Sequence, residues 1–121
     1  MSITITDGVA VINAESIPEA EVDVEDREAL GSPWRVRRFR IPCGDGWRLS
    51  VVFGSGTYSD NRDYGYGGGE WRDAVDRAEV GILSPDGLVD LFGWGDTVKG
   101  YCPADEVVDI LVAVRAHVAA L

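Results

Sequence analysis

The residue types that could carry out chemistry in this chain point to binding rather than to catalysis. The single histidine, His117, lies near the end of the last predicted helix, where a structural role is typical. Cys43 and Cys102 are the only cysteines, and their separation excludes a local zinc site or a C-x-x-C redox pair. No nucleophile is accompanied by a base, and no complete phosphate-binding loop is present. We therefore expect a protein that is not an enzyme and that holds no cofactor or metal.

An aromatic, glycine-rich segment, residues 54–71, gives the clearest sign of a binding surface. It is dominated by Gly, Ser, Asp and Asn and has few apolar groups to fix its backbone by burial. It is therefore predicted to be the most mobile internal part of the chain and its main contact surface, because tyrosine offers a large contact area at low entropic cost. The alternative is a hairpin connection whose aromatic side chains fold onto the sheet. The candidate contact residues are Tyr58, Tyr64, Tyr66 and Trp71, joined by Trp94 from a later loop.

A group of arginines in residues 35–48 is the second candidate. Arginines beside aromatic residues can bind phosphate groups or stack on nucleic-acid bases. Alternatively, they line a solvated sheet face and pair with the acidic segment 15–28, and the distribution of charge favours this second interpretation. The arginines are Arg35, Arg37, Arg38, Arg40 and Arg48, of which Arg38 is the candidate binding residue.

Aspartates in the second half form the third candidate, because Ca²⁺ and Mg²⁺ prefer oxygen ligands. Their spacing does not match an EF-hand loop, and we predict no metal site. The residues concerned are Asp60, Asp63, Asp73 and Asp76.

The charge and length of the chain restrict its class. The net charge is −10, with −7 over residues 1–30, +4 over residues 31–62 and −7 over residues 63–121. Such acidity disfavours nonspecific binding to nucleic acid or anionic lipid. The 121 residues predict a single domain, with an acidic N-terminal hairpin and linker over 1–30 and a sheet plus helix over 31–121. Without a membrane-spanning run or a signal sequence, we expect a cytoplasmic protein whose cysteines stay reduced.

Apolar periodicity predicts an α+β fold, in which a small antiparallel sheet of hairpins and meanders carries a C-terminal helix packed on one face. Residues 3–12 resemble a hairpin around an Asp-Gly turn, 34–41 and 47–53 an antiparallel pair, and 79–83 with 88–92 a second hairpin. Residues 93–100 are predicted as a loop, and Pro103 opens a helix to about residue 120. The predicted core residues are Trp47, Leu49, Val51, Phe53, Val80, Ile82, Leu91, Val107, Ile110, Leu111 and Val114.

Two local predictions are less direct. The parity of the apolar residues changes within 34–41, which predicts a β-bulge near Arg37-Arg38. Residues 13–23 are predicted as loop and 24–30 as a short helix with Asp23 as its N-cap, although Val22 and Val24 also fit an extended chain.

Residues 45–121 contain an ordered set of motifs. The run D-G-W-R-L-S-V-V at 45–52 resembles the N-G-Y-G-x-S-V strand of a group of small bacteriophage proteins, and Thr57-Tyr58 stands where that group has a loop tyrosine. Residues 79–87 match its E-L-A-V-L…D-G hairpin, and residues 96–107 match its D-D-V-x-G-Y-L-T-x-x-E-V segment. Trp47 replaces the usual tyrosine, Pro103 replaces the usual threonine, and residues 1–44 have no counterpart.

The resemblance implies a phage accessory protein without an assigned enzymatic role. We therefore expect a protein that binds a bacterial host protein in the host cytoplasm and modulates host physiology or defence. A binder of a small nucleotide signal and an acidic mimic of nucleic acid are the alternatives. Direct nucleic-acid binding and membrane association are not expected, and the sequence leaves the oligomeric state open.

Overall fold

The structure, a computed structural model, describes residues 2–6, 9–13, 21–29, 31–65, 69–72 and 76–121. These residues form eight strands and one helix. In chain order the elements are β1 (Ser2–Thr6), β2 (Val9–Asn13), β3 (Glu21–Ala29), β4 (Ser32–Gly44), β5 (Trp47–Gly54), β6 (Arg77–Ser84), β7 (Gly87–Val89), β8 (Val98–Pro103) and α1 (Ala104–Ala119).

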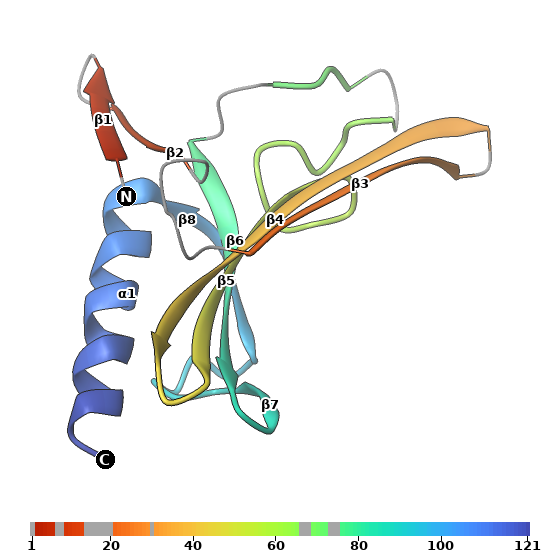
Figure 1. The fold of residues 1–121 in the computed structure, drawn as a ribbon. Coiled ribbons are helices and arrows are strands. Elements are labelled where there is room, and N and C mark those ends of the chain that lie inside the picture. The colour runs from red at the N-terminus through yellow and green to blue at the C-terminus, as the bar shows by residue number, and fades with distance from the viewer. Residues whose placement is uncertain (1, 7–8, 14–20, 30, 66–68, 73–75) are drawn as a thin grey trace.

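The main layer is an antiparallel sheet of six strands in the order β3-β4-β5-β6-β7, with β8 also paired to β6. Helix α1 lies against one face of this sheet and contacts β4, β5, β6 and β8 (Figure 1). Strands β1 and β2 form a separate antiparallel pair, as predicted, although the predicted turn residues Asp7-Gly8 lie outside the described residues. The predicted α+β fold is therefore confirmed. Among the described residues, no helix is both long enough and apolar enough to cross a bilayer.

The core lies between α1 and the sheet. Alternate residues of β5 and β6 meet residues three or four apart on α1, which are the periods expected of a strand and a helix. All the predicted core residues belong to this cluster, with Trp47, Phe53 and Leu91 only partly buried at its margin. The buried members are Phe39, Ile41, Cys43, Leu49, Val51, Ala78, Val80, Ile82, Cys102, Val107, Ile110, Leu111, Val114 and Val118.

The two cysteines are both free, as predicted, and both are buried. Burial raises the pKa of the Cys102 thiol to about 11, with a further contribution from the Glu106 carboxylate. Burial also raises the pKa of Cys43. Both side chains therefore behave as small apolar core residues rather than as reactive thiols. His117 packs edge-on against Trp47 with 5.6 Å between ring centroids, in keeping with its predicted structural role.

The bulge predicted at Arg37-Arg38 is wrong. The pairing of β4 with β5 runs without a shift from Val36 to Pro42, and the one irregularity lies between Pro42 and Gly44. The change of apolar parity arises because both faces of the sheet are covered at this level. Phe39 faces the main core, whereas Val36 and Val52 are buried outside it, and alternation along the strand places them on the opposite face.

The short helix predicted at 24–30 is also wrong, and so is the prediction that residues 21–23 belong to the preceding loop. Residues 21–29 form β3, which pairs with β4 over its whole length. The pattern of Val22 and Val24 alternating with acidic residues fits a strand, and the row of arginines on β4 supplies the partners that the isolated segment lacks. Tertiary pairing thus overrides a weak local helix signal.

The C-terminal third matches its prediction except for one strand. The 79–92 hairpin is present, with a shorter second strand, around the Ser84–Gly87 turn. Residues 98–103, predicted as loop up to residue 100, instead form β8 and pair with β6. Pro103 has an extended backbone and is the N-cap of α1, whose first turn carries Asp105 and Glu106 as expected at the positive end of the helix dipole.

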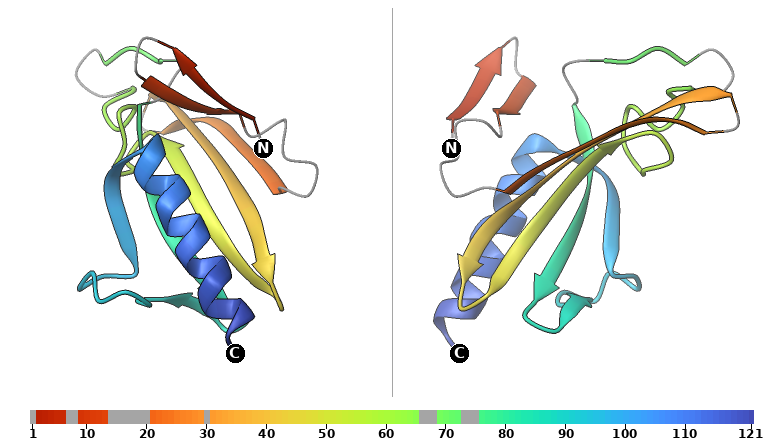
Figure 2. Two further views of the ribbon diagram at one scale, coloured as in Figure 1. Left: turned by 90° about the vertical axis from the view of Figure 1, so that its left-hand side faces the viewer. Right: turned by 45° about the vertical axis from the view of Figure 1, so that its right-hand side comes forward.

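Strand β3 and the part of β4 that pairs with it, residues 21–29 and 32–40, form an arm, and its outer end, 26–29 with 32–35, is two-stranded and projects beyond the helix. Figures 1 and 2 show that the segment after β5, in yellow-green, lies beside this arm in every view. The loop that the sequence singled out is therefore positioned by the arm, at the end of the sheet remote from the C-terminus of α1.

Replacing Leu111 by alanine is expected to lower the free energy of unfolding by about 2–5 kcal/mol, because the side chain is 3% exposed at the centre of the core. The neighbouring Val112 is 61% exposed, so Val112→Ala is the matched control and should change stability by less than about 0.5 kcal/mol. Chemical denaturation measures both. Equal effects of the two substitutions would mean that α1 does not pack on this face.

Candidate functional site

The segment that follows β5, residues 54–65, is built around buried polar side chains. Ser55, Ser59 and Asn61 are at most 2% exposed. The Ser59 hydroxyl accepts hydrogen bonds from the backbone N–H of Gly54 at 3.1 Å and of Asn61 at 3.3 Å. Its oxygen also lies 2.8 Å from the Thr57 hydroxyl. The side chains of the loop thus satisfy backbone groups that burial would otherwise leave unpaired.

Ser55 fixes the loop to the arm. Its N–H donates to the Arg35 carbonyl oxygen at 2.8 Å, and its hydroxyl accepts from the Arg35 N–H at 3.1 Å. The same hydroxyl donates to the Tyr64 carbonyl oxygen at 2.9 Å, which draws both ends of the loop together. Gly54 permits the contact, since a Cβ at this position, where φ is +135°, would lie 2.2 Å from the Arg35 carbonyl oxygen.

Asn61 connects the loop to the chain beyond it. Its side-chain amide donates to the Arg72 carbonyl oxygen at 2.9 Å, and its side-chain oxygen accepts from the Arg72 N–H at 3.0 Å. These two bonds satisfy both the backbone N–H and the carbonyl oxygen of Arg72, as pairing with a neighbouring strand would. They bring residues 69–72 against residues 61–64, although ten residues of chain separate Asn61 from Arg72.

Asp60 anchors the loop to the start of β6. Its carboxylate is 3% exposed, although Arg77, its ion-pair partner, is 55% exposed. It accepts from the Arg77 Nε at 2.7 Å and from the backbone N–H groups of Arg77 at 3.0 Å and Asp76 at 3.2 Å. A carboxylate is tolerated inside a protein when it is paired and hydrogen-bonded in this way.

Two tyrosines from distant parts of the chain meet beside this anchor. The Tyr101 N–H donates to the Tyr58 carbonyl oxygen at 2.8 Å, and the Tyr58 N–H donates to the Glu79 carboxylate at 2.7 Å. Their rings lie 6.4 Å apart at 63°. The approach needs Gly100, where a Cβ would stand 2.6 Å from the Tyr58 Cβ. The rings nevertheless remain exposed, with Tyr58 at 47% and Tyr101 at 42%.

Tyr101 has an unusual backbone. Its φ is +53°, in the left-handed region that bulky residues rarely adopt. The conformation costs a non-glycine residue roughly 1–2 kcal/mol. It occurs within β8 at the irregularity where the pairing with β6 shifts, between the paired residues Lys99 and Cys102. The strain therefore accompanies the outward placement of an aromatic side chain at the edge of the loop.

Each exposed tyrosine carries a guanidinium group over its ring. Arg62 lies 4.5 Å from the centroid of Tyr58, and Arg77 lies 5.4 Å from the centroid of Tyr101. Cation–π contacts of this kind contribute about 0.5–1 kcal/mol at exposed sites. In the described residues the buried Nη1 of Arg62 has no hydrogen-bond acceptor. These four residues, Tyr58, Arg62, Arg77 and Tyr101, are called the tyrosine surface below.

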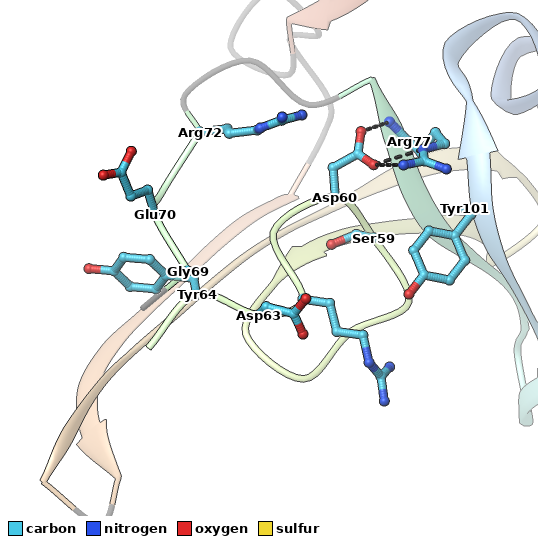
Figure 3. A pocket seen from close by; sticks show the side chains of 10 residues that line it. Ser59, Asp60, Asp63, Tyr64, Gly69, Glu70, Arg72, Arg77 and Tyr101 are labelled. Atoms are coloured by element: carbon cyan, nitrogen blue, oxygen red, sulfur yellow. Dashed lines mark hydrogen bonds and ion pairs between the residues drawn. The ribbon is translucent and has the colours of Figure 1, made fainter. Parts of the chain in front are cut away.

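A hollow of about 340 Å³ adjoins the tyrosine surface (Figure 3). Figure 3 shows the Asp60–Arg77 pair and Tyr101 on one side of it, with Tyr64 and Glu70 on the other. Its charged groups balance, because three arginines face three carboxylates. The lining residues are Ser59, Asp60, Arg62, Asp63, Tyr64, Gly69, Glu70, Arg72, Arg77 and Tyr101.

A second aromatic group lies on the arm. Trp71 packs 6.2 Å from Phe53 and 5.3 Å from Tyr64, measured between ring centroids. The guanidinium groups of Arg35 and Arg37 lie over the Trp71 ring at 5.0 and 5.4 Å. These rings therefore fold onto the sheet, as the alternative interpretation of the loop expected, and Trp71 acts mainly as a cover for one face of the arm.

The arginines of β4 pair with the acids of β3. Asp26 binds the Arg37 guanidinium at 2.9 and 3.2 Å and the Arg35 Nε at 3.1 Å. The hydrogen bond from Arg37 is the main reason that the pKa of Asp26 lies below its usual value. Further ion pairs join Arg38 to Asp23 at 3.4 Å, and Glu21 to Arg48 at 3.3 Å and Arg40 at 3.8 Å. The prediction that these arginines pair with the acidic segment is confirmed.

The structure separates the predicted contact residues into different places. Tyr58 belongs to the tyrosine surface, whereas Tyr64 and Trp71 stack on the arm. Arg38 lies on the opposite face of β4 from Phe39, and Trp94 packs on the core beyond the other end of β8. Tyr66 lies outside the described residues. The mobility of residues 54–71 stays a prediction, but Ser55, Ser59 and Asn61, three of the polar residues that suggested it, are buried and hydrogen-bonded.

Sequence reasoning did not identify Arg62, Arg77 and Tyr101 as contact residues. Tyr101 entered the sequence analysis only as the tyrosine that matches the G-Y pair of the phage segment, and Asp60 only as a candidate cation ligand. In the described residues, no group of three or more His, Cys, Asp or Glu side chains could hold a metal ion, and Asp73 lies outside them. Comparison with known protein families, with curated proteins and with solved structures gave no match.

The strain at Tyr101 predicts an unusual order of stability among its variants. Because glycine adopts positive φ without a steric penalty, Tyr101→Gly is expected to be more stable than Tyr101→Ala by about 1 kcal/mol, although alanine is ordinarily the better strand residue. Both variants lose the same ring contacts, so their difference isolates the backbone term. Thermal or urea unfolding of the pair measures it, and an alanine variant that is as stable as the glycine variant would show that no strain is present.

Proposed function

We propose that this protein is a non-enzymatic binding protein whose partner is another protein, contacted through the tyrosine surface. One observation carries the proposal. The backbone is strained at Tyr101, and the close approach to Tyr58 requires a glycine at position 100. The Tyr101 ring that this arrangement positions is exposed rather than buried. Strained backbone that the surrounding structure maintains is typical of functional positions.

The composition of the tyrosine surface suits a protein interface. Tyrosine and arginine are enriched among the residues that dominate binding energy. Here both tyrosines are attached through their backbones, and both guanidinium groups rest on rings, so little side-chain entropy remains to be lost on binding. The adjoining hollow could receive a side chain of the partner beside the Asp60–Arg77 pair.

The charges near this surface favour a protein over a nucleotide. Three carboxylates balance the three arginines of the hollow, and the arginines of β4 are engaged by β3 and by Trp71. An anionic ligand would therefore have to displace existing ion pairs in a chain whose net charge is −10. The resemblance to small phage proteins supports a bacterial host protein as the partner and the modulation of host physiology or defence as the outcome.

Capture from a bacterial lysate tests this proposal. The immobilised protein is expected to retain a defined host protein at moderate salt, identified by mass spectrometry. The double variant Tyr58→Ser/Tyr101→Gly should retain at least tenfold less of it, equivalent to about 1.4 kcal/mol. Its melting temperature should stay near that of the parent, because both rings are half exposed.

The matched control for this capture is Val112→Ser, which alters an exposed residue on α1 that is not part of the tyrosine surface. The control should capture the partner as well as the parent does. Undiminished capture by the double variant, confirmed with the purified partner, would exclude the tyrosine surface as the contact. A partner that dissociates as salt rises, whichever variant is used, would instead indicate an acidic mimic of nucleic acid.

A further inference from the structure

Strand β3 is an open edge of the main sheet. It pairs only with β4, so the backbone groups on its other side have no strand partner among the described residues. Its nine residues pair with β4 without a register shift, and every residue but Ala29 is exposed. An edge of this length offers a continuous row of backbone donors and acceptors to a further strand.

Among the described residues, β3 has only one of the features that usually close such an edge, its charged side chains. Proteins commonly protect edge strands by keeping them short, by a bulge, by proline, by charged side chains, lysine above all, or by a covering segment. Residues 21–29 contain no proline, glycine or lysine and show no bulge. Val22 and Val24 share one face of the strand and are 56% and 54% exposed, which gives the edge an apolar strip as well.

The acids of β3 determine which strand would fit. Asp23 and Glu25 share the face opposite the valines, and each uses only one carboxylate oxygen, toward Arg38 and Arg27 respectively. Glu28 lies on the same face as the valines and makes no ion pair in the part of the chain that the structure describes. A neighbouring strand with basic residues opposite Asp23 and Glu25 and apolar residues opposite Val22 and Val24 would complement this part of the edge.

We infer that β3 is a docking edge that accepts a strand from a partner protein, with basic and apolar residues alternating along it. The partner's backbone would extend the hydrogen-bonded ladder, and its side chains would provide the selectivity, as in other cases of strand addition. A second copy of β3 is a poor occupant, because residues 21–29 carry a net charge of −4 in each copy, and full-length antiparallel self-pairing would place Glu25 opposite Glu25 and both valines opposite acids. This inference does not depend on the tyrosine surface, which other elements build.

Synthetic nonapeptides test this inference on the full chain. The probe alternates Lys and Val, and one control replaces every Lys by Glu. A second control keeps the Lys-Val sequence but carries N-methyl groups on alternate backbone nitrogens, so that it retains the charge and cannot extend a ladder. Fluorescence anisotropy is expected to show at least tenfold tighter binding of the probe than of either control. Backbone amide signals of β3, but not those of α1, should shift on binding.

Two proline variants locate the contact on β3. Adjacent residues of a strand point their N–H groups to opposite sides, so only one of Val24→Pro and Glu25→Pro places the ring on the open edge. That variant should keep the melting temperature near that of the parent and bind the probe at least tenfold more weakly. The other variant should be destabilised, because it removes a hydrogen bond to β4.

Three results would overturn the inference. Equal binding of the probe and its N-methylated form would mean that charge alone attracts the peptide. Absence of binding would mean that the acids of β3 keep the edge closed to other strands. A dimer of the parent chain in sedimentation, abolished by the open-edge proline, would make a second copy the occupant.

Discussion

Buried hydrogen bonds made by polar side chains hold the proposed binding surface in place. Residues 54–65 contain no buried apolar side chain, so the hydrophobic effect does little to fix this stretch of backbone. Ser55, Ser59, Asp60 and Asn61 take over that task by bonding to β4, to the loop itself, to β6 and to residue 72. Each bond contributes little when it is made, but a buried group left unpaired costs about 1–3 kcal/mol. The conformation of the loop is therefore fixed because the loss of any one of these hydrogen bonds would leave a buried polar group unpaired.

The arm on which this loop rests depends on charge pairing rather than on a core. Acids of β3 pair with arginines of β4, and two of the same guanidinium groups lie over the Trp71 ring. Exposed ion pairs contribute little individually, but Asp26 with its two arginines forms a small network in which each charge positions the next. Pairing also leaves the arm nearly neutral within an acidic chain, which limits the repulsion between the N-terminal and C-terminal regions.

The sequence predicted the elements whose apolar period is unambiguous. Leu49 and Val51 on β5, Val80 and Ile82 on β6, and the stripe of α1 all lie where their spacing placed them. β3 was not predicted as a strand because its alternating acids and valines favour a strand only when the arginines of β4 lie opposite them. The site was harder still. Serine and asparagine in a glycine-rich stretch resemble a solvated loop, and no local pattern shows that Asn61 will bond residue 72 or that β8 will place Tyr101 beside Tyr58.

Hydrogen exchange of backbone amides most directly tests whether buried polar bonds hold this surface in place. The informative amides are those of Ser55, Arg72 and Tyr101, which donate to Arg35, Asn61 and Tyr58. In the free protein their opening free energies should lie within about 1 kcal/mol of those for the central amides of β5, because the loop and the sheet would open together. Exchange of these three amides at nearly unprotected rates, while β5 stays protected, would contradict the account and show that the tyrosines are displayed on a separately opening loop.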